Sequence, residues 1–286
     1  VSMNANALVV EGGAMRGIFA AGVLDAFMDS NFFPFDLCIG VSAGAINLAG
    51  YLANAPGRNH RVFTDFMTRP EFVNRWRFLK GGHMMDLDWL WEISMRETPL
   101  DAKRIASHTA DFLVVVTNAV TGEPEYLQPN ADDLAEALRA SSALPGFYRD
   151  TVKLNGKEYA DGTVSDPIPF EEAKKRGAKG IMVVRSRPQA FRMSEGGRQW
   201  STRWLLRHQP ALLQRSLQRA QRYNGALDQI RSNSDKSDDV FVLEVCPPPD
   251  FETARLTVDP AVLKRDYARG RACGMQAMAK WEERWQ

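Results

Sequence analysis

The chain has 286 residues, which is enough for one large domain or two small ones around a sizeable core. Hydrophobic residues make up 44% and charged residues 25%, a composition that excludes disordered, collagen-like and disulfide-rich miniprotein classes. The formal net charge of +1 creates no overall field that would favour a nucleic-acid partner.

The cysteines and the apolar runs of the sequence indicate where in the cell the protein is located. Cys38, Cys246 and Cys273 are odd in number and widely spaced, which argues against a disulfide framework or a zinc cage and fits a reducing compartment. The first residues contain neither the basic region nor the apolar stretch of a secretory signal. No run approaches the roughly 18 apolar residues of a membrane span. We therefore expect a cytoplasmic protein, with peripheral contact to a membrane at most.

Two units of strand, glycine turn and helix open the chain. Residues 7–10 form a short apolar run that predicts a buried strand, and apolar positions recur with helical spacing over 17–30. The pattern repeats with a strand at 35–40 and a helix at 43–55, which Pro56 ends. Strands joined by helical crossovers run parallel, so the predicted fold class is an α/β sandwich.

Further strands and helices follow in the rest of the chain. Strands are predicted at 112–116, 125–128, 180–184 and 240–245. Asn155 and Gly156 indicate the two-residue turn of a hairpin within 152–159. Helices are predicted near 59–68, 86–95, 101–108, 131–140, 199–231 and 260–285.

A sequence typical of a nucleophile turn joins the second predicted strand to the second predicted helix. Gly40, Ser42 and Gly44 fit the pattern G-x-S-x-G. A tight strand-to-helix turn points the serine oxygen out of the backbone, and small residues on either side let substrate approach. A chance match in a glycine-containing loop is the alternative, but the flanking strand and helix favour a functional serine.

No histidine is well placed to act as a base for Ser42. His60 and His108 lie in or at the ends of polar predicted helices, and His83 follows two glycines. Neither these nor His208 comes directly after a predicted strand. An ordinary triad of serine, histidine and aspartate therefore fits the sequence poorly.

A glycine loop lies between the first predicted strand and the first predicted helix. It reads GGAMRG from Gly12 to Gly17, which is neither the G-x-G-x-x-G of dinucleotide-binding proteins nor a loop ending in G-K-[ST]. Because ligands gather at the carboxyl ends of parallel strands, its backbone N–H groups would face the serine turn as an oxyanion hole. Each such donor contributes about 2.7–4 kcal/mol to acyl transfer. The alternative is a turn that only packs a helix on a strand.

Together these motifs resemble the bacterial patatin-like phospholipases. That family carries a G-G-G-x-R-G oxyanion loop, a G-x-S-x-G serine and a distant D-G-[GA], which match residues 12–17, 40–44 and 161–163 here. Residues 141–147 also look like the family's block ahead of the aspartate. The four blocks run in the family's order from residue 8 to about 170, and the tail beyond about 190 carries no matching motif.

The resemblance implies a three-layer α/β/α sandwich with a mainly parallel central sheet. It also implies a single patatin-like hydrolase domain over 1–286, with a motif-bearing core of about 7–190 and a C-terminal extension of about 191–286. No metal and no organic cofactor is expected. The implied substrate is an acyl ester or a phospholipid.

The resemblance further implies a Ser–Asp dyad that works without a histidine, with Asp161 as the base for Ser42. The oxyanion hole would be built by the N–H groups of Gly12, Gly13 and Ala14. The supporting residues would be Arg16, Gly17, Gly40, Gly44 and Gly162.

An aspartate can act as such a base only in a special environment. Its ordinary pKa is about 3.9, far below that of a serine hydroxyl, so Asp161 must be fixed and partly desolvated to gain basicity. Asp161 ends a predicted hairpin strand and precedes Gly162, which suits a fixed carboxylate. The alternatives are that Asp161 is an ordinary turn residue, or that Asp166, interpreted as a turn former before a helix near 170, supplies the carboxylate.

Two positions depart from the family's pattern. Ala14 stands where the third glycine falls, and it would be strained if that position requires a positive φ. Thr163 replaces a small residue and could crowd Asp161. Arg16 matches the family's arginine, and it could hold the loop, balance charge or form a helix-start salt bridge.

The segment 192–231 is basic and contains tryptophans. Its eight arginines stand against Glu195 and Asp228, and Trp200 and Trp204 lie among them. Basic helices with tryptophan can bind anionic membrane surfaces. The alternative is a solvated face, because four apolar residues have the spacing of a core-facing stripe: Leu213, Leu217, Ala220 and Leu227.

The expected activity is hydrolysis of acyl esters in two steps, through an acyl-enzyme on Ser42. An acyltransferase or thioesterase that uses the same serine is one alternative. The other is a non-catalytic lipid-binding or scaffold protein with a degenerate site, which Ala14 and Thr163 motivate.

Overall fold

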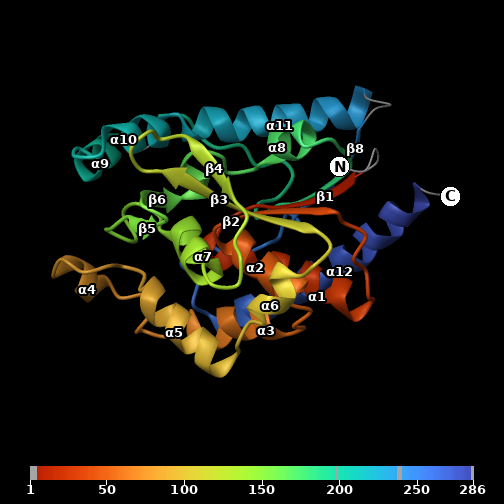
Figure 1. Ribbon diagram of the computed structural model, residues 1–286, viewed down its shortest axis with the longest axis horizontal. Coiled ribbons are helices and arrows are strands. Elements are labelled where there is room, and N and C mark those ends of the chain that lie inside the picture. Colours follow the sequence, from red (N-terminus) through yellow and green to blue (C-terminus); the bar gives the residue numbers. More distant parts are fainter. Residues whose placement is uncertain (1–4, 197–198, 237–239, 285–286) are drawn as a thin grey trace.

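The computed structural model describes residues 5–196, 199–236 and 240–284, which form a three-layer α/β/α sandwich (Figure 1). The described strands are β1 (Ala5–Val10), β2 (Leu37–Val41), β3 (Asp111–Asn118), β4 (Pro124–Leu127), β5 (Val152–Leu154), β6 (Lys157–Asp161), β7 (Ala178–Val184) and β8 (Phe241–Val245). They build one sheet in the order β5-β6-β3-β2-β1-β7-β8, with β4 also paired to β3. Neighbours from β3 through β2, β1 and β7 to β8 are parallel, whereas pairs that involve β4, β5 or β6 are antiparallel. The predicted fold class is therefore confirmed.

Helices cover both faces of the sheet (Figure 1). One face carries α1 (Gly17–Asp29), α2 (Ala43–Leu52), α7 (Leu134–Ser142) and α12 (Pro260–Glu283), and the other carries α8 (Phe170–Lys175) and α11 (Arg219–Lys236). The shorter helices are α3 (Arg58–Arg61), α4 (Arg75–Leu79), α5 (Leu87–Glu97), α6 (Ala102–Ala106), α9 (Gln199–Leu205) and α10 (Pro210–Leu217). Single turns are η1 (Ala14–Arg16), η2 (Val62–Phe66) and η3 (Gly162–Val164). Across the described ranges, no helix has the length and apolar composition that crossing a bilayer requires.

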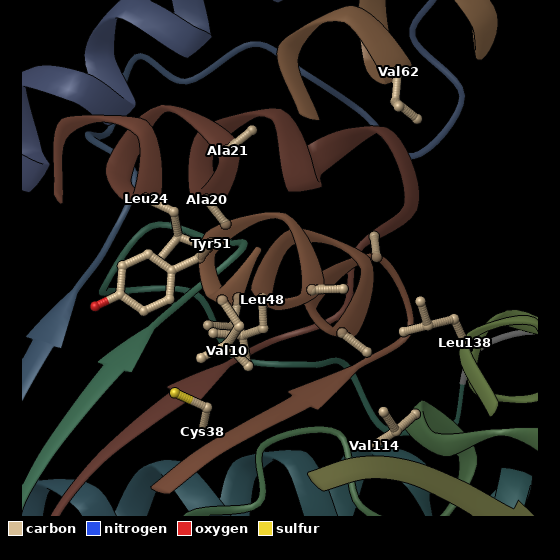
Figure 2. Close-up of a cluster of buried hydrophobic side chains, with 14 of the residues drawn as sticks. Val10, Ala20, Ala21, Leu24, Cys38, Leu48, Tyr51, Val62, Val114 and Leu138 are labelled. Atoms are coloured by element: carbon tan, nitrogen blue, oxygen red, sulfur yellow. The ribbon is translucent and has the colours of Figure 1, made fainter. Parts of the chain in front are cut away.

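Alternate residues of the central strands enter two separate cores. Val10, Cys38 and Val114 pack beneath α1 and α2, as Figure 2 shows. Val9 and Ile39 face the opposite way, toward α8 and α11. Because both faces of these strands are buried, the strands are apolar throughout and appear in the sequence as short continuous apolar runs.

The predicted hairpin at 152–159 is confirmed as β5 and β6, which pair antiparallel. Asn155 and Gly156 both have positive φ, 51° and 77°, as the two-residue turn requires. The helix predicted at 131–140 begins only at Leu134, because Asn130 and Asp133 form a polar turn before it, with the Asn130 N–H 2.7 Å from Asp133 Oδ1.

The helix predicted at 199–231 is divided into α9, α10 and α11. Pro210 begins α10, where its missing N–H does no harm, and α10 ends at Leu217, with Gln218 separating it from the start of α11. This second break shifts the apolar phase, so the predicted core stripe is wrong in part. Leu227 is buried, whereas Leu213, Leu217 and Ala220 are half-buried; the other buried positions are Leu206, Leu212, Tyr223 and Ile230. Arg198 of the basic segment and residue 285 of the last predicted helix lie outside the described residues.

The C-terminal helix α12 packs along α1 with direct contact between the two backbones. A Cβ on Gly22 would lie 2.2 Å from the carbonyl oxygen of Tyr267, and a Cβ on Gly270 would lie 2.2 Å from that of Phe19. Near the end of α12, Trp281 is buried in the same core as α1 and α2. Glycine at these two crossing points is therefore a steric requirement.

Substituting Gly270→Ala should destabilise the protein, because a methyl group at this crossing meets backbone atoms that cannot move aside. We expect a loss of about 2 kcal/mol or more in the free energy of unfolding, measured by urea denaturation. Gly225→Ala in α11 is the matched control, since its Cβ would meet nothing within 4 Å. That control should gain about 0.5–1 kcal/mol from helix propensity. Equal stability of the two variants would contradict the tight crossing.

Candidate active site

The pairing of β3 brings the serine turn and the aspartate together. β2 pairs with β3 as far as Val41 and Val115, and β6 pairs with β3 from Asp161 and Val116 onward. β4 pairs with overlapping residues of β3, so it occupies the other edge of that strand. Because β2 and β6 meet end to end along one edge, Ser42 lies beside Asp161, from which it is 119 positions away in sequence.

Ser42 has a strained backbone conformation at the start of α2. Its φ of 54° and ψ of −126° are uncommon for a residue with a side chain. Gly40 and Gly44 give this turn its room. A Cβ on Gly40 would lie 2.5 Å from Cα of Ala45, and one on Gly44 would lie 2.3 Å from the carbonyl oxygen of Val10. The G-x-S-x-G spacing therefore meets a steric need of a sharp strand-to-helix turn.

The Ser42 hydroxyl donates a hydrogen bond to the carboxylate of Asp161. The distance from Oγ to Oδ2 is 2.9 Å, and the two residues are only 8% and 2% exposed. The other carboxylate oxygen, Oδ1, accepts the N–H of Thr163 at 2.7 Å. Burial raises the pKa of Asp161, although Thr163, Arg219 and Ser42 oppose this shift. Asp161 is thus a fixed carboxylate that is more basic than a solvated aspartate.

The other candidate bases point elsewhere. Asp166, the competing carboxylate, accepts a hydrogen bond from the Tyr126 hydroxyl at 2.7 Å. Among the described residues, no histidine lines the cavity that contains Ser42. Asp161 is therefore the carboxylate that the fold presents to the serine.

Ser141 holds the serine turn through two hydrogen bonds, a role that the sequence does not indicate, although residues 141–147 resemble the family's block ahead of the aspartate. Its Oγ accepts the N–H of Ser42 at 2.8 Å and donates to the carbonyl oxygen of Val115 at 2.6 Å. The backbone N–H of Ser42 is therefore already bonded to Ser141.

The glycine loop lies directly against Ser42. A Cβ on Gly12 would lie 3.0 Å from the Cβ of Ser42. In the described part of the chain, the N–H groups of Gly12, Gly13 and Ala14 donate no hydrogen bond, so they are open to an anion. Ala14 has a φ of 50°, so this position does require the conformation that favours glycine. The alanine costs roughly 1–2 kcal/mol there, yet the loop keeps its shape. Gly17 follows as the first residue of α1.

Thr163 does not crowd Asp161, contrary to expectation. Its N–H holds the carboxylate, and its methyl group lies against the glycine loop, 2.8 Å from where a Cβ on Gly12 would be. Gly162 is required for a different reason, since a Cβ there would lie 2.3 Å from the carbonyl oxygen of Val115. Both residues therefore pack the aspartate turn closely between β3 and the loop.

A buried polar network supports the glycine loop. Glu11, which precedes the loop, accepts the N–H of Ser186 at 2.8 Å, its hydroxyl at 2.9 Å, and the hydroxyl of Tyr223 at 3.1 Å. The fully buried Arg185 lies 3.4 Å from Glu11 and 2.6 Å from Glu244. This network fixes the start of the loop to β7, β8 and α11, which sequence reasoning could not have placed beside it.

Arg16 is buried and forms no ion pair with any described residue, so the helix-start salt bridge is excluded from that part of the chain. Its Nε has no hydrogen-bond partner. Burial and the nearby charge of Arg187 lower the pKa of Arg16 to about 9. Its backbone N–H donates to the carbonyl of Gly13 at 3.2 Å, which closes the loop turn.

One cavity unites the hydroxyl, the carboxylate and the loop. Its walls include Ser42, Asp161 and residues 12–14, together with Arg219 of α11 and Arg255 of the loop after β8. No sequence pattern indicates a site role for these two arginines, and Arg219 stands out in the sequence only as part of the basic segment 192–231. Within the ranges described above, no group of three or more His, Cys, Asp and Glu side chains is arranged to hold a metal ion.

Comparisons with known proteins identify the family of this chain. The family model of patatin-like phospholipases matches residues 8–174, and a model described as a domain of unknown function (DUF6363) matches residues 209–286. The uncharacterised protein YjjU of Escherichia coli (strain K12) is 37% identical over 277 residues, covering 96% of this chain and 77% of that protein. The crystal structure of VipD from Legionella pneumophila has a TM-score of 0.46 at 12% identity, covering 98% of this chain and 67% of that one. Because the first family model spans more than half of the chain, the chain belongs to the patatin-like phospholipases, a family of lipid acyl hydrolases.

Proposed function

We propose that this protein hydrolyses carboxylic esters of lipids, with Ser42 as the nucleophile and Asp161 as the base. The observation that carries the proposal is the 2.9 Å hydrogen bond from Ser42 Oγ to Asp161 Oδ2, in a cavity that also contains the unbonded N–H groups of residues 12–14. The family supports a lipid ester as the substrate.

In the first step, Ser42 Oγ attacks the ester carbonyl carbon while its proton passes to Asp161. The negative charge that develops on the carbonyl oxygen is held by the N–H groups of Gly12, Gly13 and Ala14. The tetrahedral intermediate then expels the alcohol, which takes the proton from Asp161. Ser42 is left as an acyl ester.

In the second step, water attacks the acyl ester while Asp161 accepts one of its protons. The same loop N–H groups hold the second oxyanion. Collapse releases the fatty acid and returns the proton to Ser42 Oγ. The positive end of α1, which starts just beyond the loop at Gly17, adds to the stabilisation of negative charge. The steps use only groups of the protein and water.

Replacing either member of the pair should remove the activity. We expect Ser42→Ala and Asp161→Asn to lower kcat/KM for fluorogenic acyl esters by about a thousandfold or more, because the nucleophile or its base is lost. A fluorophosphonate probe should label the unaltered protein and not Ser42→Ala. Ser94→Ala, at a buried serine of α5, is the matched control and should keep full activity and labelling.

The same experiment separates the alternatives. Full activity in Asp161→Asn would reject the pair as the catalytic unit. Transfer of the acyl group to an added alcohol in preference to water would identify an acyltransferase. No labelling and no turnover in the unaltered protein would identify a non-catalytic lipid-binding protein.

The acidic limb of the pH–rate profile should report Asp161. Only the ionised carboxylate can accept the proton of Ser42, so kcat/KM falls as the pH drops through the pKa of Asp161. Because burial raises that pKa, the limb should lie above the ordinary value of about 3.9. Asp166→Asn is the control, since burial also raises the pKa of Asp166 but its carboxylate binds Tyr126. If the acidic limb shifts in Asp166→Asn, the limb reports the titration of Asp166, and the prediction that it reports Asp161 is wrong.

We also propose that α9 makes the peripheral contact with anionic membranes. Trp200 and Trp204 are 77% and 65% exposed, and the exposed Arg203 and Arg207 flank them, with the Arg207 guanidinium 4.9 Å from the Trp204 ring centroid. The rest of the basic segment contributes less charge to such a surface. Three of its arginines are engaged elsewhere: Arg192 with Asp228, Arg215 with Glu123, and Arg219 in the cavity.

Removing the two tryptophans should weaken this contact. We expect Trp200→Ser/Trp204→Ser to bind vesicles containing phosphatidylglycerol at least about fivefold less than the unaltered protein in a sedimentation assay, because buried aromatic area is lost. Trp76→Ser on α4, a residue that is 74% exposed, is the matched control. Equal binding to anionic and neutral vesicles would end the proposal.

We further propose that residues 1–286 form a single domain, with the C-terminal extension as part of it. β8 continues the central sheet beside β7, and α12 packs on α1. The extension also supplies Tyr223 to the network around Glu11. These contacts support one folding unit rather than a hydrolase with a separate appendage.

A further inference from the structure

Four arginines that the proposed reaction does not use line two neighbouring cavities, one of which contains Ser42. Arg16, Arg219 and Arg255 line the cavity that contains Ser42, and the same three line a neighbouring cavity together with Arg187. They come from four separate segments: the glycine loop, the loop after β7, the first residue of α11 and the loop after β8. Their meeting is therefore a product of the tertiary fold.

These arginines are not neutralised by ion pairs. No salt bridge joins any of the four to a carboxylate within the described residues. The Nε atoms of Arg16 and Arg219 are buried without a hydrogen-bond partner. The two nearby carboxylates, Asp161 and Glu11, already accept hydrogen bonds from other groups. The cavity therefore presents an excess of positive charge.

The crowding of like charges carries an electrostatic cost. Burial and the charge of Arg187 lower the pKa of Arg16 to about 9, and burial and Arg219 lower that of Arg255 to about 10. Burial also lowers the pKa of Arg219. Several guanidinium groups confined in a poorly solvated cavity are costly unless an anion shares it.

The C-terminal region holds Arg255 firmly against the site. The carbonyl oxygen of Arg255 accepts the N–H of Met15 from the glycine loop at 3.4 Å. Two residues earlier, Thr253 donates from its N–H and its hydroxyl to Asp266 of α12, at 2.7 Å and 2.6 Å. The Arg255 guanidinium lies 5.6 Å from the ring centroid of Phe147. These contacts make the loop after β8 a fixed wall of the cavity.

We propose that Arg16, Arg187, Arg219 and Arg255 bind the phosphate group of an acyl-ester substrate whose carbonyl lies at Ser42. This inference rests on the proposed hydrolase function. Guanidinium groups recognise phosphate oxygens through paired, charge-assisted hydrogen bonds, and several of them around one cavity suit the three or more oxygens of phosphate better than the two of a carboxylate. Arg219 and Arg255 give the C-terminal region a direct part in substrate selection.

The first test compares a phosphate-bearing ester with a neutral one. The substrates are dihexanoyl phosphatidic acid, kept below its micelle concentration, and p-nitrophenyl butyrate. In Arg219→Gln and in Arg255→Gln, we expect the ratio of kcat/KM for the phosphatidic acid to that for the neutral ester to fall at least about tenfold, mainly through KM. Arg265→Gln on α12, where Arg265 forms an exposed ion pair with Glu252 of the preceding loop, is the matched control and should leave the ratio unchanged.

The second test measures binding without catalysis. Dihexanoyl phosphatidic acid and inorganic phosphate are titrated calorimetrically into Ser42→Ala, Ser42→Ala/Arg219→Gln and Ser42→Ala/Arg255→Gln. We expect each second substitution to weaken phosphatidic acid binding at least about tenfold. Inorganic phosphate should bind more weakly than the lipid and compete with it. Thermal unfolding of each variant checks that it is folded. If one of the two arginine variants fails to fold, the other still tests the inference.

The outcomes distinguish this inference from the proposed hydrolase. If the unaltered protein hydrolyses neither ester but binds phosphatidic acid through these arginines, the hydrolase proposal fails and the anion site stands. Suppose that the unaltered protein hydrolyses the neutral ester and that the arginine variants lower kcat/KM equally for both esters. The arginines then only set the basicity of Asp161, and the inference fails. It also fails if phosphatidic acid binds no better than inorganic phosphate.

Discussion

The pairing of β3 is the constraint on which the site depends. One edge of this strand pairs first with β2, as far as Val115, and then with β6, from Val116 onward. β2 ends just before Ser42 and β6 ends at Asp161, so the two residues meet where one partner strand replaces the other. The other edge is taken by β4, so β6 has nowhere else to pair over these residues. The 2.9 Å contact between Ser42 and Asp161 is therefore set by main-chain hydrogen bonds of the sheet, before any side-chain preference acts.

Residues that follow β7 in the chain complete the support of the glycine loop. The carboxylate of Glu11 is satisfied by Ser186 and Tyr223, and through Arg185 it is linked to Glu244 on β8. A buried carboxylate left without these partners would be costly, so the start of the glycine loop depends on residues far along the chain. A family match that ends at residue 174 accordingly leaves part of the cavity wall to the region matched by a domain of unknown function.

Local patterns were sufficient to predict the fold class and to single out Ser42 and the glycine loop, whereas Asp161 was assigned to Ser42 through the resemblance to the family. The apolar runs of β1, β2 and β3 identified buried parallel strands, and Asn155 with Gly156 identified the hairpin, because each is a property of a few neighbouring residues. The order of strands in the sheet was not predictable in this way, since it is set by pairings between distant segments. Arg219 shows the same limit. Its sequence neighbours place it in a basic stretch, and only the packing of α11 turns it toward Ser42.

The hydrogen bonds of Ser141 have a consequence for the energy of the proposed chemical step. Ser42 is held in a conformation that few side-chain-bearing residues adopt, and relaxation of that turn would require its N–H to leave Ser141 Oγ, which is itself bound to β3. In the proposed reaction the turn already has the shape that it needs, so little reorganisation would be left for the moment when charge develops on the ester oxygen. The energy of the strained backbone at Ser42 is supplied when the protein folds. Binding of a substrate would not have to supply it.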